Sequence, residues 1–90
     1  MTNVRDNAEK SRFELDVEGE IAFANYRRRG SDLLITHVEA PPRLRGKGVA
    51  SDLMHGIVDI ARAEGQSLVP LCSYAAAWIR RHARHRDIPI

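Results

Sequence analysis

Two glycines separated by one residue, Gly46 and Gly48, lie where a strand-like pattern gives way to a helix-like pattern. Glycine lets the backbone come close to a ligand, and the first N–H groups of a helix have no partner within the helix. Arg43, Arg45 and Lys47 surround the two glycines with positive charge. Such a turn can hold a phosphate, because its N–H groups and the helix dipole both favour an anion.

The phosphate interpretation assigns successive backbone N–H groups of this turn to the anion. The residues it predicts for that role are Arg45, Gly46, Lys47, Gly48, Val49 and Ala50. The alternative is a tight strand-to-helix connection, in which the glycines serve only the geometry of the turn and the basic side chains face solvent.

Three side chains outside the turn have the chemistry of nucleophiles or bases. Cys72 follows a short apolar segment, at the carboxyl end of an expected strand, where α/β sheets bind ligands. A thiol beside a helix start can be activated, although a lone cysteine is more often a small buried residue. His37 and Glu39 point to one face of a strand, and either can accept a proton. Their structural alternatives are a hydrogen-bonded strand residue and a solvated edge charge.

The elements that must position these residues begin with strands. Apolar and charged residues alternate over residues 12–29 and predict a hairpin that turns at Glu18-Gly19. Gly30-Ser31 is the next turn. Residues 32–39 have a continuously apolar centre, which predicts a central strand covered on both sides. Pro41-Pro42 must end that strand, because proline cannot donate to a ladder.

Helices and a second parallel strand follow the glycine turn. Apolar residues at helical spacing predict a helix over residues 49–64, which Gly65 ends. Residues 67–71 predict a strand parallel to the previous one, and residues 74–83 a last helix. The expected architecture is therefore α/β, with N-terminal antiparallel strands that lead into a β-α-β unit and a C-terminal helix.

Length and charge place limits on the domain and its ligand. Ninety residues with 43% hydrophobic residues allow one modest core, so we expect a single domain over residues 1–90, with residues 1–11 flexible. Residues 1–42 carry 6 basic and 8 acidic side chains, net −2, whereas residues 43–90 carry 8 and 4, net +4. An anionic ligand is therefore expected on the second half.

Cysteine content and hydropathy exclude several classes of protein. Cys72 is the single cysteine, so an internal disulfide and a cysteine-based zinc cluster are excluded. His82 and His85 lack a third ligand, and no metal site is predicted. No apolar run approaches the ~20 residues that span a bilayer, and residues 1–12 contain no apolar signal-peptide region. The sequence therefore predicts a cytoplasmic protein that does not enter a membrane.

The glycine turn also carries a family resemblance. Read as Arg-x-x-Gly-x-Gly followed by Val49-Ala50, it resembles the pyrophosphate-binding segment of the GCN5-related N-acetyltransferases. A second matching segment is Val69-Pro70-Leu71-Cys72-Ser73-Tyr74. Over residues 13–88 the chain is similar to the small single-domain acetyltransferase-like family of the YjdJ type, which keeps only the acetyl-CoA half of the fold.

The resemblance implies how acetyl-CoA would be bound. The turn would hold the pyrophosphate, and the pantetheine arm would bond to main-chain groups where the two parallel strands splay apart. An arginine of the basic cluster that ends the last helix would reach the adenosine 3′-phosphate. The coenzyme-binding residues implied are Val38, Ala40, Arg45, Gly46, Lys47, Gly48, Val49, Ala50, Ser73 and Arg80.

The resemblance also implies catalytic roles. Glu39, acting through water, or His37 would deprotonate the acceptor amine, while Cys72 would take up the acyl group transiently or line the pantetheine channel. Larger acetyltransferases place substrate-binding helices near their N-terminus. The first strand is expected here near Arg12 and leaves no room for them, so the acceptor site would be open or completed by a protein partner.

We therefore expect an acetyl-CoA-dependent N-acetyltransferase that acts on an unidentified amine. The alternative is a non-catalytic module that binds CoA or acyl-CoA through the same loop. Nucleic-acid binding through the C-terminal basic cluster would fit its charge, but the cluster lacks interleaved aromatic residues, and we expect no nucleic-acid partner.

Overall fold

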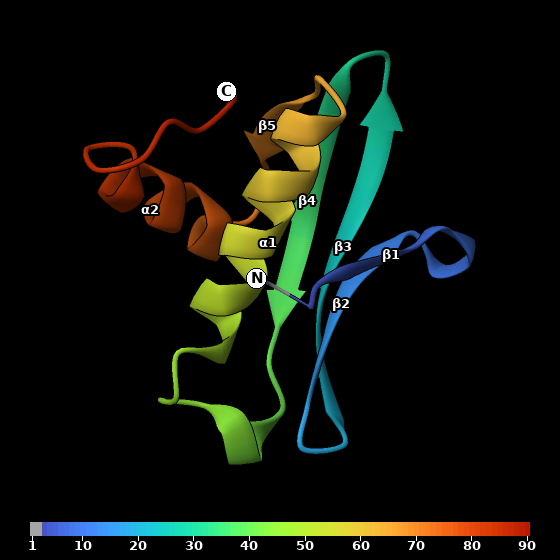
Figure 1. The fold of residues 1–90 in the computed structure, drawn as a ribbon, viewed down its shortest axis with the longest axis vertical. Coiled ribbons are helices and arrows are strands. Elements are labelled where there is room, and N and C mark those ends of the chain that lie inside the picture. Colours follow the sequence, from blue (N-terminus) through green and yellow to red (C-terminus); the bar gives the residue numbers. More distant parts are fainter. Residues whose placement is uncertain (1–2) are drawn as a thin grey trace.

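The segment from Arg12 to Arg29, in which apolar and charged residues alternate, forms a hairpin of two strands (Figure 1). The other strands of the sheet pair along its two sides. The computed structural model describes residues 3–90. Its elements, in chain order, are β1 Arg5–Asn7, the 3-10 helix η1 Ala8–Lys10, β2 Arg12–Val17, β3 Glu20–Arg29, β4 Asp32–Glu39, the 3-10 helix η2 Pro42–Leu44, α1 Val49–Ala63, β5 Ser67–Pro70 and α2 Ser73–His82.

The five strands form one sheet in the order β1-β2-β3-β4-β5. Neighbours are antiparallel from β1 to β4, and β4 pairs with β5 in parallel. Glu18 and Gly19, with φ of 55° and 82°, turn the β2–β3 hairpin in the conformation that two-residue hairpins favour. The predicted α/β architecture, the hairpin and the interior strand β4 are confirmed.

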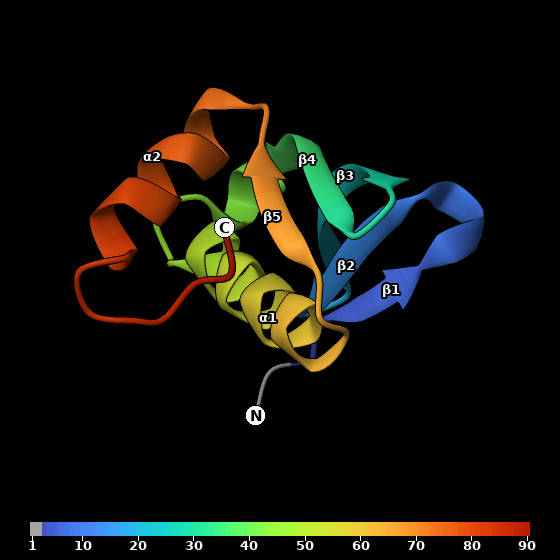
Figure 2. The ribbon, with the colours of Figure 1, turned by 90° about the horizontal axis from the view of Figure 1, so that it is seen from above.

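The sheet curves around α1, and the core lies between them (Figure 2). One face of α1 is buried, through Val49, Leu53, Met54, Ile57, Val58 and Ala61. These side chains pack with Phe13, Leu33 and Ile35 from the strands and with Trp78 from α2. Burying an apolar side chain of this size stabilises the fold by about 2 kcal/mol. Because α2 contacts both α1 and β5, it is held in place beside the start of α1.

The segments around α1 end where the sequence predicts. β4 ends at Glu39, one residue before Pro41 and Pro42, and η2 begins at the second proline. Gly65, with φ of 67°, follows the end of α1, and the N–H of Gln66 donates to the carbonyl of Ala61 at 2.9 Å. This left-handed cap satisfies the last carbonyls of the helix.

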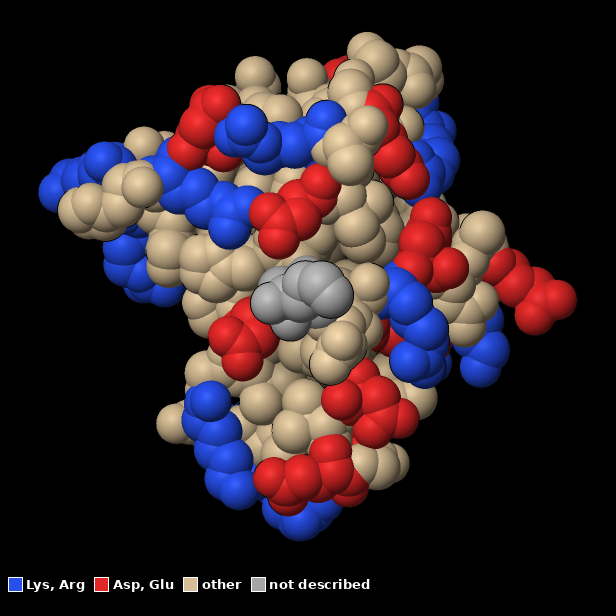
Figure 3. All heavy atoms as spheres, in the orientation of Figure 1, with Lys and Arg blue, Asp and Glu red and all other residues tan. Residues whose placement is uncertain are grey.

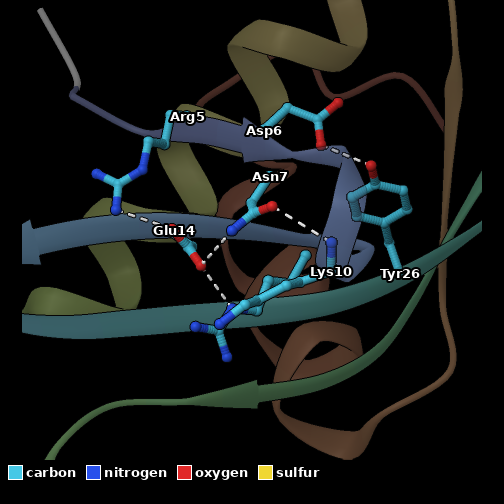
Figure 4. Close-up of polar contacts among 7 residues, drawn as sticks. Arg5, Asp6, Asn7, Lys10, Glu14 and Tyr26 are labelled. Atoms are coloured by element: carbon cyan, nitrogen blue, oxygen red, sulfur yellow. Dashed lines mark hydrogen bonds and ion pairs between the residues drawn. The ribbon is translucent and has the colours of Figure 1, made fainter.

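The prediction that the first strand begins near residue 12 was wrong, because β1 precedes it. All three residues of β1 are tied down by side chains (Figure 4). Arg5 pairs with Glu14 at 2.8 Å, and Asn7 donates to the same carboxylate at 3.0 Å. Asp6 accepts from the Tyr26 hydroxyl at 2.5 Å. Of the segment 1–11 that was expected to be flexible, residues 1–2 lie outside the described residues.

Candidate functional site

The glycine turn, residues 45–50, joins η2 to α1 through two glycines in the left-handed conformation. Gly46 has φ of 81° and Gly48 φ of 76°, values that other residues adopt at a cost of about 1 kcal/mol. Gly48 is the N-cap of α1 and offers it no side-chain bond. Nothing lies within 4 Å of the position that a Cβ would take on either glycine, so the approach to the turn is open.

Five N–H groups of the glycine turn and of Ser51, the residue after it, have no hydrogen-bond partner within residues 3–90. The N–H groups of Arg45 and Lys47 are already used, since they donate to carbonyls of the preceding 3-10 turn at 3.2 and 3.3 Å. The first helical bond of α1 runs from the N–H of Asp52 to the carbonyl of Gly48, at 3.0 Å. The groups left over belong to Gly46, Gly48, Val49, Ala50 and Ser51.

The basic side chains around the turn differ in their availability. Arg43 pairs with Glu20 and Glu18, so its charge is largely neutralised, although the sequence suggested that it adds to the positive field. Arg45 donates through Nε to the carbonyl of Ala40 at 3.4 Å. Lys47 is exposed and forms no ion pair within the described residues. Two cations, rather than three, therefore remain for an anion.

The two parallel strands separate before β4 ends. The last pair in their register is Ile35 with Pro70, and the N–H of Leu71 donates to the carbonyl of Ile35 at 2.8 Å. Proline supplies no further N–H to the ladder. The end of β4, including Val38, and then Ala40 therefore run on beside the gap without a partner strand on that edge within residues 3–90.

A pocket of about 260 Å³ connects the turn with the start of α2. Its lining residues are Ala40, Leu44, Arg45, Gly46, Gly48, Val49, Ala50, Ser51 and Tyr74. Burial raises the pKa of the Tyr74 phenol, Arg81 lowers it and Cys72 raises it. The hydroxyl of Ser51 accepts from the Trp78 indole N–H at 2.8 Å, and that bond joins the pocket to the α1–α2 contact.

Cys72 is the N-cap of α2. Its Sγ accepts from the N–H of Ala75 at 3.4 Å, and the side chain is half-buried against the core. Sulfur in this position replaces the hydroxyl or carboxylate oxygen that usually caps a helix. No hydrogen bond or ion pair joins Cys72 to His37 or Glu39 in the described part of the chain, so the three predicted catalytic residues do not form one hydrogen-bonded group.

His37 and Glu39 bond to each other on the part of β4 that extends past β5. His37 Nε2 lies 3.0 Å from Glu39 Oε1, and both side chains are 52% exposed. A proton on Nε2 makes this a hydrogen bond to the carboxylate and leaves Nδ1 as the free acceptor of the ring. Glu39 therefore orients His37, and the ring is open to solvent.

Basic residues of α2 and of the segment that follows it line a second, more open pocket of about 440 Å³. Arg80 lies there with Ala77, Arg81, Arg84 and His85, and Figure 3 shows basic side chains gathered over the α2 end of the molecule. Tyr74, Ala77 and Arg81 are three and four residues apart and share one stripe of the helix. The second pocket thus begins about one helical turn from Tyr74. Ser73 is exposed at the first position of α2.

Two residues of this region, Ser51 and Tyr74, were not predicted from the sequence. Tyr74 was noted only as part of a matching segment, and Ser51 was assigned to the helix. A rule that the first three residues after a helical N-cap carry free N–H groups would have included Ser51. No local signal marks Tyr74, because its place in the pocket depends on how α2 packs.

Comparison with known proteins gives the family. A model of the family described as GCN5-related N-acetyl-transferase matches residues 12–88. The chain belongs to the GCN5-related N-acetyltransferase family. No curated protein sequence matches it. The solution structure of a GCN5-like protein from Staphylococcus aureus superposes on this acetyltransferase-family chain with a TM-score of 0.72 and 22% identity, over 98% of this chain and 89% of that one.

The family assignment and the superposition confirm the resemblance and the fold inferred from the sequence. Family members in general use acetyl-CoA. No group of His, Cys, Asp and Glu side chains among residues 3–90 is arranged to hold a metal ion. No helix in the same part of the chain is long and apolar enough to cross a membrane.

Proposed function

We propose that this protein binds acetyl-CoA at the glycine turn and transfers the acetyl group to an amine. The observation that carries the proposal is the set of five free N–H groups at the start of α1. They line one pocket with Arg45 and Tyr74. Backbone donors at a helix N-terminus suit a pyrophosphate, because the helix dipole adds to their charge.

Surfaces beside the glycine turn would bind the other parts of the coenzyme. The pantetheine arm would run beside the unpaired edge of β4, where main-chain groups near Val38 and Ala40 offer hydrogen bonds. The adenosine 3′-phosphate would lie by the pocket lined by Arg80 and Arg84. In this assignment Ser73 lies at the border between the pantetheine arm and the helix start.

Bound acetyl-CoA would supply an acetyl thioester. Transfer requires a neutral amine, whose nitrogen forms the new C–N bond as the C–S bond breaks. His37 Nδ1 would take the proton of the amine, oriented by the bond between Nε2 and Glu39. The Tyr74 hydroxyl, which belongs to a residue lining the pocket, would give a proton to the sulfur, since a phenol is protonated at neutral pH.

Calorimetric titration with acetyl-CoA, followed by an assay for release of free CoA with a panel of amines, tests the proposal. Gly48→Asp should abolish binding, because a carboxylate at the turn repels the pyrophosphate. Gly65→Asp is the matched control, since Gly65 has φ of 67° at the opposite end of α1. Both substitutions have open space for a side chain and carry a similar backbone cost.

Three outcomes separate the readings of the turn. Loss of binding in Gly48→Asp alone, with CoA release by the parent protein, supports the acetyltransferase. Binding without release for any amine would instead assign the non-catalytic CoA-binding module. Equal binding by the parent and Gly48→Asp would make the turn a simple connection and overturn the proposal.

A further inference from the structure

The face of the sheet turned away from α1 carries a polar surface that neither helix covers over β2 and β3 (Figure 2). The strand register places Arg12, Asn25 and His37 side by side across β2, β3 and β4. In the neighbouring row Phe23 separates Glu14 from Glu39. Because side chains two apart share a face, both rows belong to the same surface.

Arg12 is held firmly at one end of this surface. Its Nε donates to Glu14 at 2.6 Å, and its guanidinium carbon lies 4.6 Å from the centre of the Phe23 ring. The side chain is only 22% exposed. Its two Nη groups donate to no other group within residues 3–90. They are the unused part of a fork that suits a carboxylate.

Glu14 neutralises only one of the two arginines beside it, so this end of the surface keeps a positive charge. Its carboxylate is 3% exposed and bonds to Arg12, Arg5 and Asn7 (Figure 4). The hydrogen bond from Arg12 is the main reason that the pKa of Glu14 is lowered, so it stays ionised. Two arginines therefore share one carboxylate, and one net positive charge remains for a further anion.

The other end of the surface holds the proposed base. His37 and Glu39 are separated from the strand of Arg12 by two strand spacings, about 10 Å in all. Glu39 gives that end a negative charge, which attracts an ammonium group. Between the two ends lie Asn25 and Phe23, one a hydrogen-bonding side chain and the other an aromatic ring. The surface is thus positive at one end and negative at the other.

We infer that the acceptor is a small amine that also carries a carboxylate, bound across this surface. Its carboxylate would bond to the Nη groups of Arg12, and its amino group would lie by His37 and Glu39. This inference rests on the proposed acetyl transfer, and it names the class of acceptor. A polyamine fits less well, because its second cation would face Arg12.

Three probes of matched chain length test the inference. They are ε-aminocaproate, its carboxamide, and cadaverine, which has an amine in place of the carboxylate. We expect KM for ε-aminocaproate to be lower by about tenfold or more than for the other two, as one charge-assisted pair would give. Arg12→Gln should remove this preference and leave acetyl-CoA affinity unchanged.

A matched variant separates binding from folding. Arg5→Gln breaks the other ion pair of Glu14 but leaves Arg12 in place. It should keep the preference for the carboxylate, whereas a loss equal to that of Arg12→Gln would overturn the inference and make the cluster structural. Arg29→Gln, on an exposed side chain at the far end of β3, controls for loss of a positive charge.

Binding of the probes is measured directly, from amide chemical shifts. This measurement separates a failure of the inference from a failure of the proposed acetyl transfer. Equal turnover of all three probes would overturn the inference and leave acetyl transfer intact. If no probe is turned over but ε-aminocaproate binds and needs Arg12, the carboxylate site stands and acetyl transfer fails. Absence of both turnover and binding with ε-aminocaproate overturns the inference.

Discussion

At the scale of single residues, Cys72 has a structural role that its chemistry does not suggest. The sulfur caps the first turn of α2 through the N–H of Ala75, and the side chain is half-buried beside the core. Within residues 3–90 no base bonds to the thiol. A helix cap and packing against the core account for these contacts without an acyl-enzyme step.

We therefore predict that Cys72→Ser keeps acetyl transfer, because serine caps a helix at least as well. Cys72→Ala should retain activity but lower the free energy of unfolding by about 1 kcal/mol, the usual cost of a lost cap. Denaturant unfolding and CoA release would measure these effects. An acetyl mass on Cys72 that hydroxylamine removes, together with loss of transfer in Cys72→Ser, would instead identify a covalent intermediate.

At the glycine turn, the two glycines were predictable from the sequence, whereas the free N–H groups were not. Gly46 and Gly48 were expected in a strand-to-helix turn, and the structure places both there, with φ of 81° and 76°. Which N–H groups are free was not predictable, since it depends on the 3-10 turn that follows Pro41. The pairing of Arg43 with Glu18 and Glu20 joins residues far apart in the chain, and only the tertiary fold brings them together.

At the scale of elements, the strands and helices with clear periodicity were predictable and β1 was not. The hairpin and α1 bury apolar side chains at regular spacing, which the sequence displays. β1 has three polar residues and buries none of them. It is held by ion pairs and hydrogen bonds to Glu14 and Tyr26, and no local pattern encodes such partners.

The contact between α1 and α2 should depend on pH through His55. Burial is the main cause that lowers the pKa of His55, and the charges of Arg86 and His82 lower it further. Asp52 and Asp59 act in the opposite direction and raise it. The His55 ring packs edge-on against Trp78, and the centres of the two rings lie 4.8 Å apart. The unfolded chain therefore takes up the proton first, and stability must fall as pH drops below about 6.5.

Thermal unfolding at about pH 7.5 and pH 5.5, on either side of an ordinary histidine pKa, checks this expectation. The parent should lose more stability on acidification than His55→Gln, which cannot take up the proton. His85→Gln is the control, because His85 is exposed in the turn that follows α2. Equal pH dependence of the parent and His55→Gln would show that the α1–α2 contact does not sense protonation of His55.

The arginines that line the second pocket, on α2 and just after it, give a further prediction. Arg80→Glu with Arg84→Glu should weaken CoA more than dephospho-CoA, because only CoA carries the 3′-phosphate. Arg27→Glu with Arg29→Glu changes the net charge equally at the end of β3 far from the glycine turn. Calorimetry on both ligands separates the effects. Equal weakening of the two ligands by the α2 pair would assign these arginines to the general field.

At the scale of the whole molecule, the two halves of the sequence supply different parts of the fold. The positive second half supplies the glycine turn and α2, whereas the first half supplies the hairpin and β1. The fold class was predictable because apolar residues alternate in the strand-forming first half and recur at helical spacing in the second half. The proposed acceptor surface did not, since it needs the register of β2, β3 and β4.

The central claim is that backbone N–H groups at the start of α1 bind the coenzyme, and amide NMR shifts during an acetyl-CoA titration test it most directly. The amides of Gly46, Gly48, Val49, Ala50 and Ser51 should shift most, because they alone at this turn lack a partner within residues 3–90. Gly19, Gly30 and Gly65 serve as internal references in other turns. Saturable shifts concentrated at the five amides are the predicted result. Unchanged turn amides, or shifts no larger there than at the reference glycines, would contradict the account.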